Sequence, residues 1–536
     1  MTIPLSLLTW GLAVLPILTL MILMIGYHWG AIKAAPIGIA ISVLTGFWIF
    51  KASPSVIALE ALKGVWSTGV VVLVIWPAIL LYEVVSQSQA FSVIRRGLQR
   101  HTPNELIQLL ALGWVFTSFL QGITGFGVPV AVGAPLLVGI GVHPIWAVLI
   151  PLIGHTWANT FGTLAVAWNA LVFQTDLSAN PALMMNTALW AAGLLWAWNL
   201  VTGSVMTWLY GGFSALKKGW PAVMVISVIQ GGGQLLLSQV NPTLAAFVPA
   251  VASMLGIMVI SRTPRYRSPW RIVDSPIMNR SVSEQNETLI SNGMSLGQAF
   301  VPYLVLTGIT LSVLLIAPVK TFLEQFRLGF AFPQTQTGYG YTNLATSAFS
   351  PIAPFTNAGM FLLLAALIGF VFYRYRGWIP RGGGITVLSR SLRKTIPSAL
   401  AVLGFIVMSR IMSGTGQTVV LAYGMAAVLG RTYAVLAPVI GMLGAFMTSS
   451  NMASNILFSE FQMTTATLLK LNTAAILGAQ TAGGAIGGTI SPGNIIMGTT
   501  TAGILGQEGL LLRRVLPITL IMAILVGLVL FVAHWG

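Results

Sequence analysis

The hydrophobic positions of this 536-residue chain gather into long apolar runs, many of them about 20 residues in length. Such runs match the roughly 30 Å hydrocarbon core of a bilayer and differ from the alternating pattern of a transmembrane β-barrel. Clear examples are residues 3–25, 30–50, 66–85 and 515–534. The pattern predicts an all-α, polytopic membrane helix bundle of about 12 to 14 spans. The first run predicts a spanning helix rather than a cleaved signal peptide, because no basic segment precedes it.

Two apolar stretches, residues 117–162 and 448–503, are interrupted by glycines and prolines and carry carboxamide and hydroxyl side chains. In hydrocarbon every backbone N–H and C=O needs a partner, so irregular backbone is tolerated only where it is buried in protein or lines a cavity. Paired interruptions in the two halves of an apolar chain are typical of the binding site of a secondary transporter. We predict two inverted repeats, each with one broken or re-entrant helical element.

The longest polar segment, residues 261–297, divides the chain into an N-terminal transmembrane half, residues 1–260, and a C-terminal half, residues 298–536. Each half holds one broken stretch, 117–162 in the first and 448–503 in the second. Basic residues gather in the dividing segment, and the positive-inside rule therefore predicts a cytoplasmic linker.

Two smaller polar features accompany this division. Residues 320–357 are expected outside the cell, as a partly ordered flap or as a loop packed on the bundle. Asn286 stands in an N-E-T motif within the linker, and we interpret it as part of a solvated loop rather than as a glycosylation site.

The composition narrows the possible functions. Only 7% of the residues are charged, against roughly 25% in an average soluble domain. The net charge of +16 comes from basic residues in short loops, so no nucleic acid partner is expected beside the lipid bilayer. The chain has no cysteine, and its five histidines are scattered without an HExxH spacing. We therefore expect no metal site, no cofactor and no enzymatic activity.

The broken stretches supply backbone N–H groups at half-helix N-termini, together with hydroxyls and carboxamides, and such groups receive carboxylates. A small organic anion is the expected ligand. The candidate substrate-binding residues are Gln121, Thr124, Gly125, Gly127, Thr156, Asn159, Ser450, Asn451, Ser454, Asn455, Ser491 and Arg410. Close helix packing by the glycines and interhelical hydrogen bonds by the polar side chains are the alternative roles. A sodium ion could also use oxygens of Ser450, Asn451 and Asn455.

Ionisable residues in apolar segments are candidates for proton coupling, because charges inside a membrane are costly and usually functional. These candidates are His155, Glu83 and Glu460, the two acids being interpreted as the only ones within apolar segments. A neutral histidine bonded inside the bundle is the alternative for His155. Three interpretations of Arg410 stay open: it binds the substrate carboxylate, it forms an ion pair with Glu83 or Glu460, or it reaches water from a helix end.

Four segments carry a family resemblance: GVWSTGVVVLVIWPAILLYEVVSQSQAFSVIRRGLQ, FTSFLQGITGFGVPVAVGAPLLVGIG, GAFMTSSNMASNILFSEFQ and GGTISPGNIIMGTTTAG. With these segments the chain resembles the L-lactate permease family over most of its length. The resemblance implies a bacterial plasma-membrane permease for L-lactate, with glycolate and D-lactate as further substrates. It also implies proton symport and a fold of two inverted repeats with re-entrant hairpins.

The sequence departs from the family pattern at four positions. An acidic residue is typical where Gln121 stands, an aspartate where Asn451 stands, an asparagine where His155 stands and a lysine where Glu83 stands. Carboxylates inside the membrane are the usual proton carriers. Because two of them are amides here, both H⁺ and Na⁺ stay open as the coupling ion.

The predicted function is secondary active transport of a small monocarboxylate by alternating access, with proton symport as the favoured coupling. A sodium-coupled or uncoupled carrier of another small organic anion is the first alternative. An anion channel and a non-transporting membrane sensor are alternatives of other classes. A channel is typically recognised by a ring of like side chains in an oligomer, and a sensor by a soluble signalling domain. Neither feature is evident in the sequence, which leaves the oligomeric state undetermined.

Overall fold

The computed structural model describes residues 3–27, 29–279 and 293–533. Among these residues, ten helices are long and apolar enough to cross a membrane, or eleven if the bent pair of α14 (Val301–Leu315) and α15 (Ala317–Glu324) forms one span. The all-α membrane bundle predicted from the sequence is confirmed. The expected count, from apolar runs of spanning length, was about 12 to 14.

The difference in span count has two sources. Helices α7 (Val128–Val138) and α8 (Pro144–Gly154) are apolar but too short to cross a bilayer. The segment Pro181–Val240 counts once, although its backbone breaks at Gly211 and Gly212. Gly212 adopts φ +59°, a left-handed conformation that glycine reaches without steric cost.

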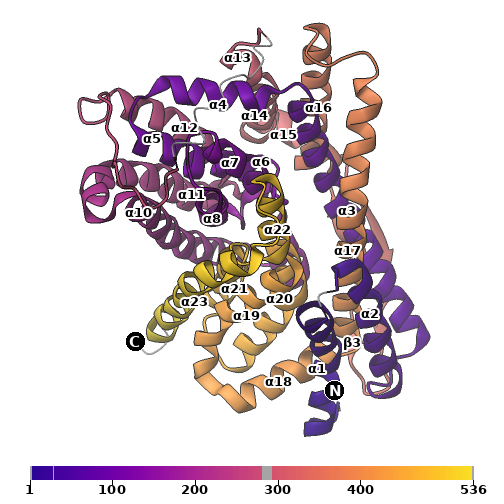
Figure 1. Cartoon of the computed structure of the whole chain (residues 1–536). Coiled ribbons are helices and arrows are strands. Elements are labelled where there is room, and N and C mark those ends of the chain that lie inside the picture. Colours follow the sequence, from indigo (N-terminus) through magenta and orange to yellow (C-terminus); the bar gives the residue numbers. More distant parts are fainter. Residues whose placement is uncertain (1–2, 28, 280–292, 534–536) are drawn as a thin grey trace.

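One lateral layer of the molecule is centred on two long helices that lie side by side, α3 and α17 (Figure 1). They run antiparallel, because Glu60 near the start of α3 pairs with Arg410 near the end of α17. Gly64 allows their close approach, since a Cβ there would lie 2.9 Å from the Cα of Val407. The helices of this layer are α1 (Leu7–Met21), the π-helical η1 (Ile22–Gly26), α2 (Ala31–Trp48), α3 (Pro54–Gln87), α16 (Ala358–Tyr375) and α17 (Gly383–Gly414).

The first broken element is a hairpin followed by an interrupted helix. Its hairpin tip, residues 124–127, holds Gly125 at φ +56° and Gly127 at φ +79°. Gly133 packs against Thr117, which lies equally far on the other side of the tip, so α6 and α7 are antiparallel. The parts in order are α5 (Glu105–Leu110), the π-helical η2 (Ala111–Val115), α6 (Phe116–Ile123), α7, α8, the 3₁₀ turn η3 (Thr156–Ala158) and α9 (Gly162–Thr175).

The second broken element repeats this plan. Ser449, at φ +56°, and Ser450 form the hairpin tip. The Ser454 hydroxyl donates to the carbonyl of Gly441 over 2.7 Å, which holds the two arms antiparallel. The parts are α19 (Tyr433–Thr448), α20 (Asn451–Leu468), α21 (Thr473–Gly487) and α22 (Pro492–Thr501), and α23 (Glu508–Ala533) follows them.

The two hairpins open toward opposite ends of the bundle. At the end of the first hairpin, the His143 amide donates to Ile277, in the segment that follows α12, so we call this end the linker side. The second hairpin leads the other way: Ser413 at the end of α17 donates to Glu460 on α20, and Asn343 of the β-segment donates to the carbonyl of Gly414. We call this end the β-side. Opposite hairpins are the arrangement expected of two inverted repeats.

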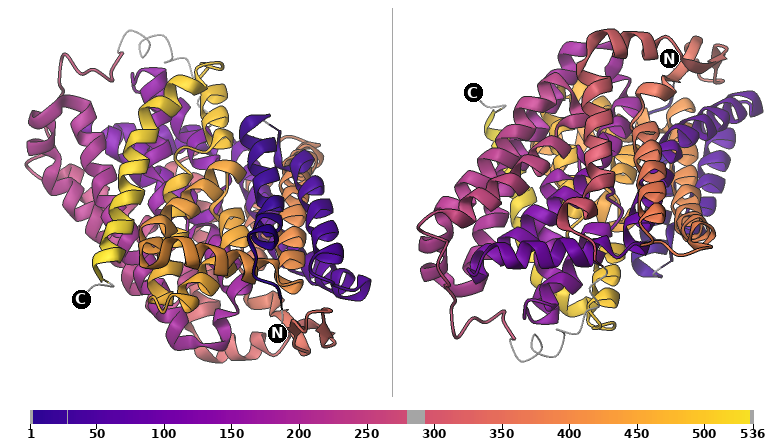
Figure 2. Two further views of the ribbon diagram at one scale, coloured as in Figure 1. Left: turned by 90° about the horizontal axis from the view of Figure 1, so that it is seen from below. Right: turned by 90° about the horizontal axis from the view of Figure 1, so that it is seen from above.

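A second lateral group of helices lies across the broken elements from the α3–α17 layer (Figure 2). Residues after this group fold back onto it, and the Arg265 guanidinium donates to the carbonyls of Lys217 and Lys218. Asn286 lies outside the described residues. The elements are α10 (Pro181–Ser227), the π-helical η5 (Val228–Gly232), α11 (Gly233–Val240), the 3₁₀ turn η6 (Pro242–Leu244) and α12 (Phe247–Arg262).

The polar stretch 320–357 contains two small two-stranded antiparallel sheets on the β-side, where they cover the ends of α3 and α17. The indole of Trp66 on α3 donates to the carbonyl of Phe349 over 3.0 Å. The strands pair as β1 (Leu328–Phe332) with β4 (Thr346–Ile352) and β2 (Thr335–Gln336) with β3 (Thr342–Asn343). The remaining short elements are α4 (Ala90–His101), η4 (Leu177–Ala179), α13 (Leu296–Ala299), η9 (Pro354–Thr356), α18 (Gln417–Leu429) and η10 (Gly430–Thr432).

Candidate functional site

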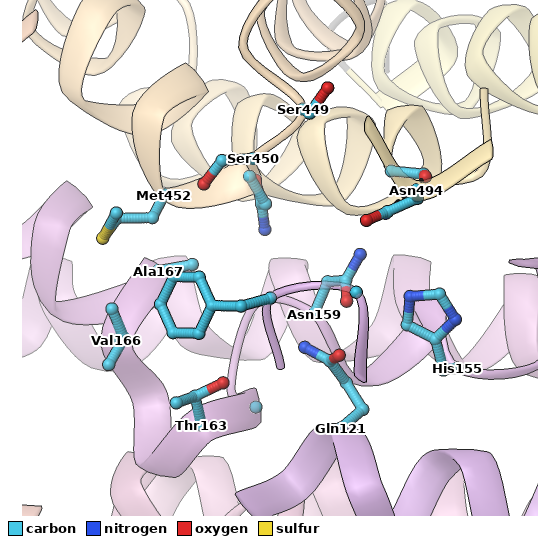
Figure 3. Close-up of a pocket in the computed structure, with 15 residues that line it drawn as sticks. Gln121, His155, Asn159, Thr163, Val166, Ala167, Ser449, Ser450, Met452 and Asn494 are labelled. Carbon is cyan, nitrogen blue, oxygen red and sulfur yellow. Dashed lines mark hydrogen bonds between the residues drawn. The ribbon is translucent and has the colours of Figure 1, made fainter. Parts of the chain in front are cut away.

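A polar cavity of about 60 Å³ lies where the four interruptions of the two broken elements meet (Figure 3). Both hairpin tips contribute to its wall, and so do the breaks between α8 and α9 and between α21 and α22. Its described lining residues are Gln121, Phe126, Gly127, His155, Asn159, Gly162, Thr163, Val166, Ala167, Ser449, Ser450, Asn451, Met452, Gly488 and Asn494.

Three helices, α7, α20 and α22, begin at this cavity. The first N–H groups of a helix have no intrahelical partner and carry partial positive charge. None of the described lining residues carries a formal positive or negative charge apart from the titratable His155. The helix ends therefore dominate the electrostatics of the cavity, and they favour an anionic group.

Two side chains present unused polar atoms to the cavity. Within the described part of the chain, the carboxamide of Gln121 makes no hydrogen bond. Nδ1 of His155 lies 2.6 Å from the carbonyl oxygen of Pro151. Because a carbonyl only accepts, Nδ1 carries the proton and Nε2 keeps its lone pair. Gln121 thus offers donors and an acceptor, and His155 offers an acceptor.

The other carboxamides of the lining also hold the wall in place. Asn159 donates to the carbonyl of Ala485 over 3.1 Å and joins the two helix breaks. Asn494 donates to the carbonyl of Gly488 over 3.0 Å. Each engages one N–H of its amide in this way. In the described structure the second N–H and the carboxamide oxygen of both side chains are left for a ligand.

A hydroxyl group on α21, that of Thr481, ties the two broken elements together behind the cavity. It lies 3.1 Å from the Thr160 hydroxyl and accepts from the Asn455 carboxamide over 2.9 Å. Asn455 also donates to the carbonyl of Ala167 over 2.9 Å, and Asn451 donates to Thr160 over 3.2 Å. These buried bonds fix α9 against α20 and α21.

The start of α9 is a left-handed turn. Thr163, Leu164 and Ala165 have φ of +50°, +52° and +68°. The left-handed conformation costs roughly 1–2 kcal/mol per residue that bears a side chain. Backbone strain of this kind persists only where the surroundings enforce it, and it concentrates at functional sites. Here the turn aims the next residues, Val166 and Ala167, into the cavity.

The predicted site residues divide between the cavity and its support. Lining the cavity are Gln121, Gly127, Asn159, Ser450, Asn451 and the coupling candidate His155. Six others lie outside the described lining, namely Thr124, Gly125, Thr156, Ser454, Asn455 and Ser491. Two of them support the wall of the cavity. The Thr156 hydroxyl accepts from the indole of Trp198, and Gly125 lies against Thr163.

Sequence reasoning missed the lining residues Phe126, Gly162, Thr163, Val166, Ala167, Met452, Gly488 and Asn494. Asn494 follows a proline at a helix start, in SPGN, and this motif could have indicated it. The apolar residues carry no such signal, because their type is the same as that of hundreds of lipid-facing and core positions.

The remaining charged candidates lie away from the described lining of the cavity. Arg410 Nη2 lies 2.7 Å from Glu60 Oε2, and Lys63 Nζ lies 2.6 Å from Glu60 Oε1. The side chain of Glu60 is 1% exposed. The expected partners of Arg410 were Glu83 or Glu460. Glu60 was missed because its place near the start of a long apolar run is typical of a solvated helix end.

Glu83 and Glu460 have separate partners. Glu83 pairs with Lys394 over 2.6 Å at the linker side of α3 and α17. Glu460 accepts from Ser413, and its second oxygen is buried without a hydrogen bond. On the β-side, burial raises the pKa of the nearby Tyr341 hydroxyl to about 12, so this group is neutral at pH 7. Glu60 and Glu83 of α3 and Glu460 of α20 thus each bind side chains of the bundle.

A second, apolar chamber of about 190 Å³ adjoins the polar cavity. The two share Phe126, Ser449, Ser450, Met452 and Asn494 in their described walls. The far wall of the chamber belongs to α17 and includes Ser398, Ala401, Val402 and Phe405. The chamber therefore lies between the broken elements and the α3–α17 layer.

The fold and the cavity define a class: a polytopic membrane protein with two opposed hairpins around a small polar cavity. A model of the L-lactate permease family matches residues 11–535. The chain belongs to the L-lactate permease family, and it is a multi-pass protein of the bacterial inner membrane. A permease family agrees with the expectation of a transporter rather than an enzyme.

Individual relatives share about a quarter of their residues with the chain. The L-lactate permease of Salmonella typhi is 28% identical over 490 residues, which cover 86% of this chain and 83% of that protein. The glycolate permease GlcA of Escherichia coli K12 is 27% identical over 490 residues, with the same shares of 86% and 83%. The crystal structure of the Alcanivorax borkumensis YdaH transporter has a TM-score of 0.42 and 14% identity, and covers 87% of this chain and 84% of that one.

Proposed function

We propose that the protein is a secondary active carrier of short monocarboxylates, with L-lactate as its principal substrate and glycolate as a second. The observation that carries this proposal is the convergence of the N-termini of α7, α20 and α22 on one small polar cavity. Such a cavity receives a carboxylate without a cationic side chain. The names of the relatives, L-lactate permease and glycolate permease, point to the same class of anion.

The size of the cavity favours a small substrate. A cavity needs about 10–15 Å³ of free volume to hold one water molecule. A cavity of 60 Å³ therefore holds roughly four to six groups of the size of a water molecule. Lactate has six non-hydrogen atoms and fits within this range. Citrate has thirteen and does not. A monocarboxylate of two or three carbons is therefore favoured over di- and tricarboxylates.

The polar groups suggest how the substrate lies. The carboxylate accepts from the first-turn N–H groups of α20 and from the amide of Gln121, which makes no other bond in the described chain. The 2-hydroxyl donates to Nε2 of His155, which keeps its lone pair because Nδ1 is engaged with Pro151. Both ends of a 2-hydroxy acid thus find complementary partners.

Alternating access agrees with the opposed hairpins, because each hairpin can close the cavity from one end. We assign the linker side to the cytoplasm under the positive-inside rule. Basic residues at that end are Lys217, Lys218, Arg262, Arg265, Arg267, Arg271, Arg374, Arg376, Arg390, Arg393, Lys394, Arg513 and Arg514. The β-side then faces outward, as expected for residues 320–357.

Counterflow in proteoliposomes tests the proposed transport. Vesicles that contain the purified protein and a high internal concentration of unlabelled lactate should take up labelled lactate transiently above its external concentration, without any ion gradient. A carrier exchanges the two pools, whereas a channel dissipates the label and a sensor moves none. Vesicles loaded with citrate are the control and should show no such accumulation. Equal uptake from both loadings would contradict the proposal.

Proton symport is the coupling that we favour, with His155 as the residue that takes up the proton. It is the titratable side chain in the described lining, and a proton on Nε2 would balance the charge of the bound carboxylate and turn this nitrogen from an acceptor into a donor to the oxygen of the 2-hydroxyl. His155→Gln should retain counterflow but lose lactate accumulation driven by an inward pH gradient. If the variant still accumulates lactate in that gradient, His155 is not the coupling residue.

A sodium-coupled carrier is the second candidate, and one observation favours it. The carboxamide oxygens of Asn451 and Asn455 are buried on α20 and have no hydrogen-bond partner among the described residues. Neutral oxygens of this kind suit a hard cation. Lactate accumulation under an inward sodium gradient, at equal pH on both sides of the vesicle, would select this candidate over proton symport.

A further inference from the structure

The apolar side chains of the cavity wall gather on one side. Val166, Ala167 and Met452 lie on this side, near Ser450 and Thr163, whereas His155 and Asn494 lie on the other (Figure 3). A ligand with charge or hydrogen-bonding groups throughout would leave the apolar side unmatched. The division therefore indicates a ligand that is itself polar at one end and apolar at the other.

The apolar side is built by specific features of the fold. Val166 and Ala167 follow the left-handed turn of α9, and the carbonyl of Ala167 is held by Asn455 of α20. Met452 stands in the first turn of α20, next to Asn451 at the polar side. All three apolar side chains are at least nine-tenths buried. The structure thus holds a fixed apolar surface opposite the polar groups.

We propose that Val166, Ala167 and Met452 receive the alkyl substituent on C2 of a 2-hydroxy monocarboxylate, and that Met452 limits the length of this substituent. The inference rests on the proposed function and adds to it the residues that set the size of the substituent on C2. With the carboxylate and the hydroxyl on the polar side, the methyl group of lactate faces this surface. Glycolate has no such group and leaves the surface empty.

Of the three residues of the apolar surface, Met452 alone also lines the apolar chamber in the described structure. It lines the polar cavity of about 60 Å³ and also the apolar chamber of about 190 Å³ beyond it. The far wall of that chamber is apolar and includes Val402 and Phe405 of α17. Shortening Met452 therefore joins the cavity to a space in which a longer alkyl chain can lie. Shortening Val166 removes two methyl groups from the wall, but Val166 is not part of the described chamber wall.

The test compares Met452→Ala, Val166→Ala and the unaltered protein in proteoliposomes. Labelled lactate counterflow is inhibited with glycolate, lactate, 2-hydroxybutyrate and 2-hydroxyvalerate. In the unaltered protein, inhibition should be strongest for lactate and should fall at 2-hydroxybutyrate. In Met452→Ala, the apparent affinity for 2-hydroxybutyrate and 2-hydroxyvalerate should rise relative to that for lactate. We expect a rise of about fourfold per methylene group, the value expected for burial of one methylene. In Val166→Ala the apparent affinity for the longer acids should rise less, and mainly for 2-hydroxybutyrate.

Met447→Ala is the matched control. Met447 is a buried methionine on α19, 5% exposed, and it lines neither the cavity nor the chamber in the described structure. In this variant the four acids should inhibit lactate counterflow in the same order of strength as in the unaltered protein. If Met452→Ala does not insert, Val166→Ala decides, and ligand-induced thermal stabilisation of the purified protein in detergent gives the same ranking without transport.

Two failures are distinguishable. If none of the 2-hydroxy acids competes in the unaltered protein, the proposed function itself is wrong. If lactate and glycolate compete but the ranking of the four acids is unchanged in both Met452→Ala and Val166→Ala, the assignment of the alkyl surface is overturned. An equal shift in Met447→Ala would overturn it as well, because the effect would then not belong to the cavity.

Discussion

Gly125→Leu and Asn451→Leu are each expected to abolish lactate uptake while the protein still inserts into the membrane. At Gly125 the backbone has φ +56°, and a Cβ would lie 2.2 Å from Oγ1 of Thr163. The first hairpin tip would have to move away from the wall. At Asn451 the change removes the donor to Thr160 and places an apolar side chain where the second tip meets the cavity.

Initial uptake rates at saturating lactate, normalised to the amount of protein in the membrane, measure this effect. We expect a loss of at least about a hundredfold for each variant, because misplacing a binding group by about 1 Å costs that much. Gly193→Leu is the matched control, since a side chain at Gly193 on α10 meets nothing within 4 Å. Normal uptake by both site variants would mean that the two tips do not form the site.

Removing Glu60 is expected to have the largest effect on stability. Glu60→Ala leaves Lys63 and Arg410 buried without their shared carboxylate. Breaking a buried ion pair on one side costs about 3–5 kcal/mol, since a buried charge is then left uncompensated. The variant should unfold at a clearly lower temperature in detergent and reach a lower level in the membrane.

The variant Arg410→Gln distinguishes a structural role of Arg410 from a role in substrate binding. Because Arg410 lies outside the described cavity lining and binds Glu60, we expect lower thermal stability and an unchanged apparent affinity for lactate in the protein that inserts. A tenfold loss of affinity with unchanged stability would instead make Arg410 a substrate ligand. Lys320→Gln is the control, because the Lys320–Glu324 pair is exposed, 3.7 Å long and expected to contribute little.

Much of the architecture could be predicted from the pattern of glycines, prolines and polar residues. Breaks near Gly125 and Ser450 follow from the cost of irregular backbone in hydrocarbon, and the structure has hairpin tips at both positions. Gln121 and Asn159 stood out because carboxamides are rare in apolar segments, and both line the cavity.

Other features depend on contacts between distant segments and have no local signal. The pairing of Glu60 with Arg410 joins residues 350 positions apart. Val166 and Met452 are ordinary apolar residues, and their role follows from the left-handed turn of α9 and from the chamber behind α20.

The ion pairs near the two ends of α3 have a spacing that matches the thickness of the membrane. Glu60 and Glu83 are 23 residues apart on one helix, a separation of about 35 Å at roughly 1.5 Å per residue. This is close to the roughly 30 Å thickness of the hydrocarbon core. The Glu60 pair is buried in the bundle, but Lys394, the partner of Glu83, is half-exposed, and a shift of the protein that moved it into the lipid tails would be costly. The permease is therefore held at one depth, and a thinner or thicker bilayer must deform around it rather than let it slide.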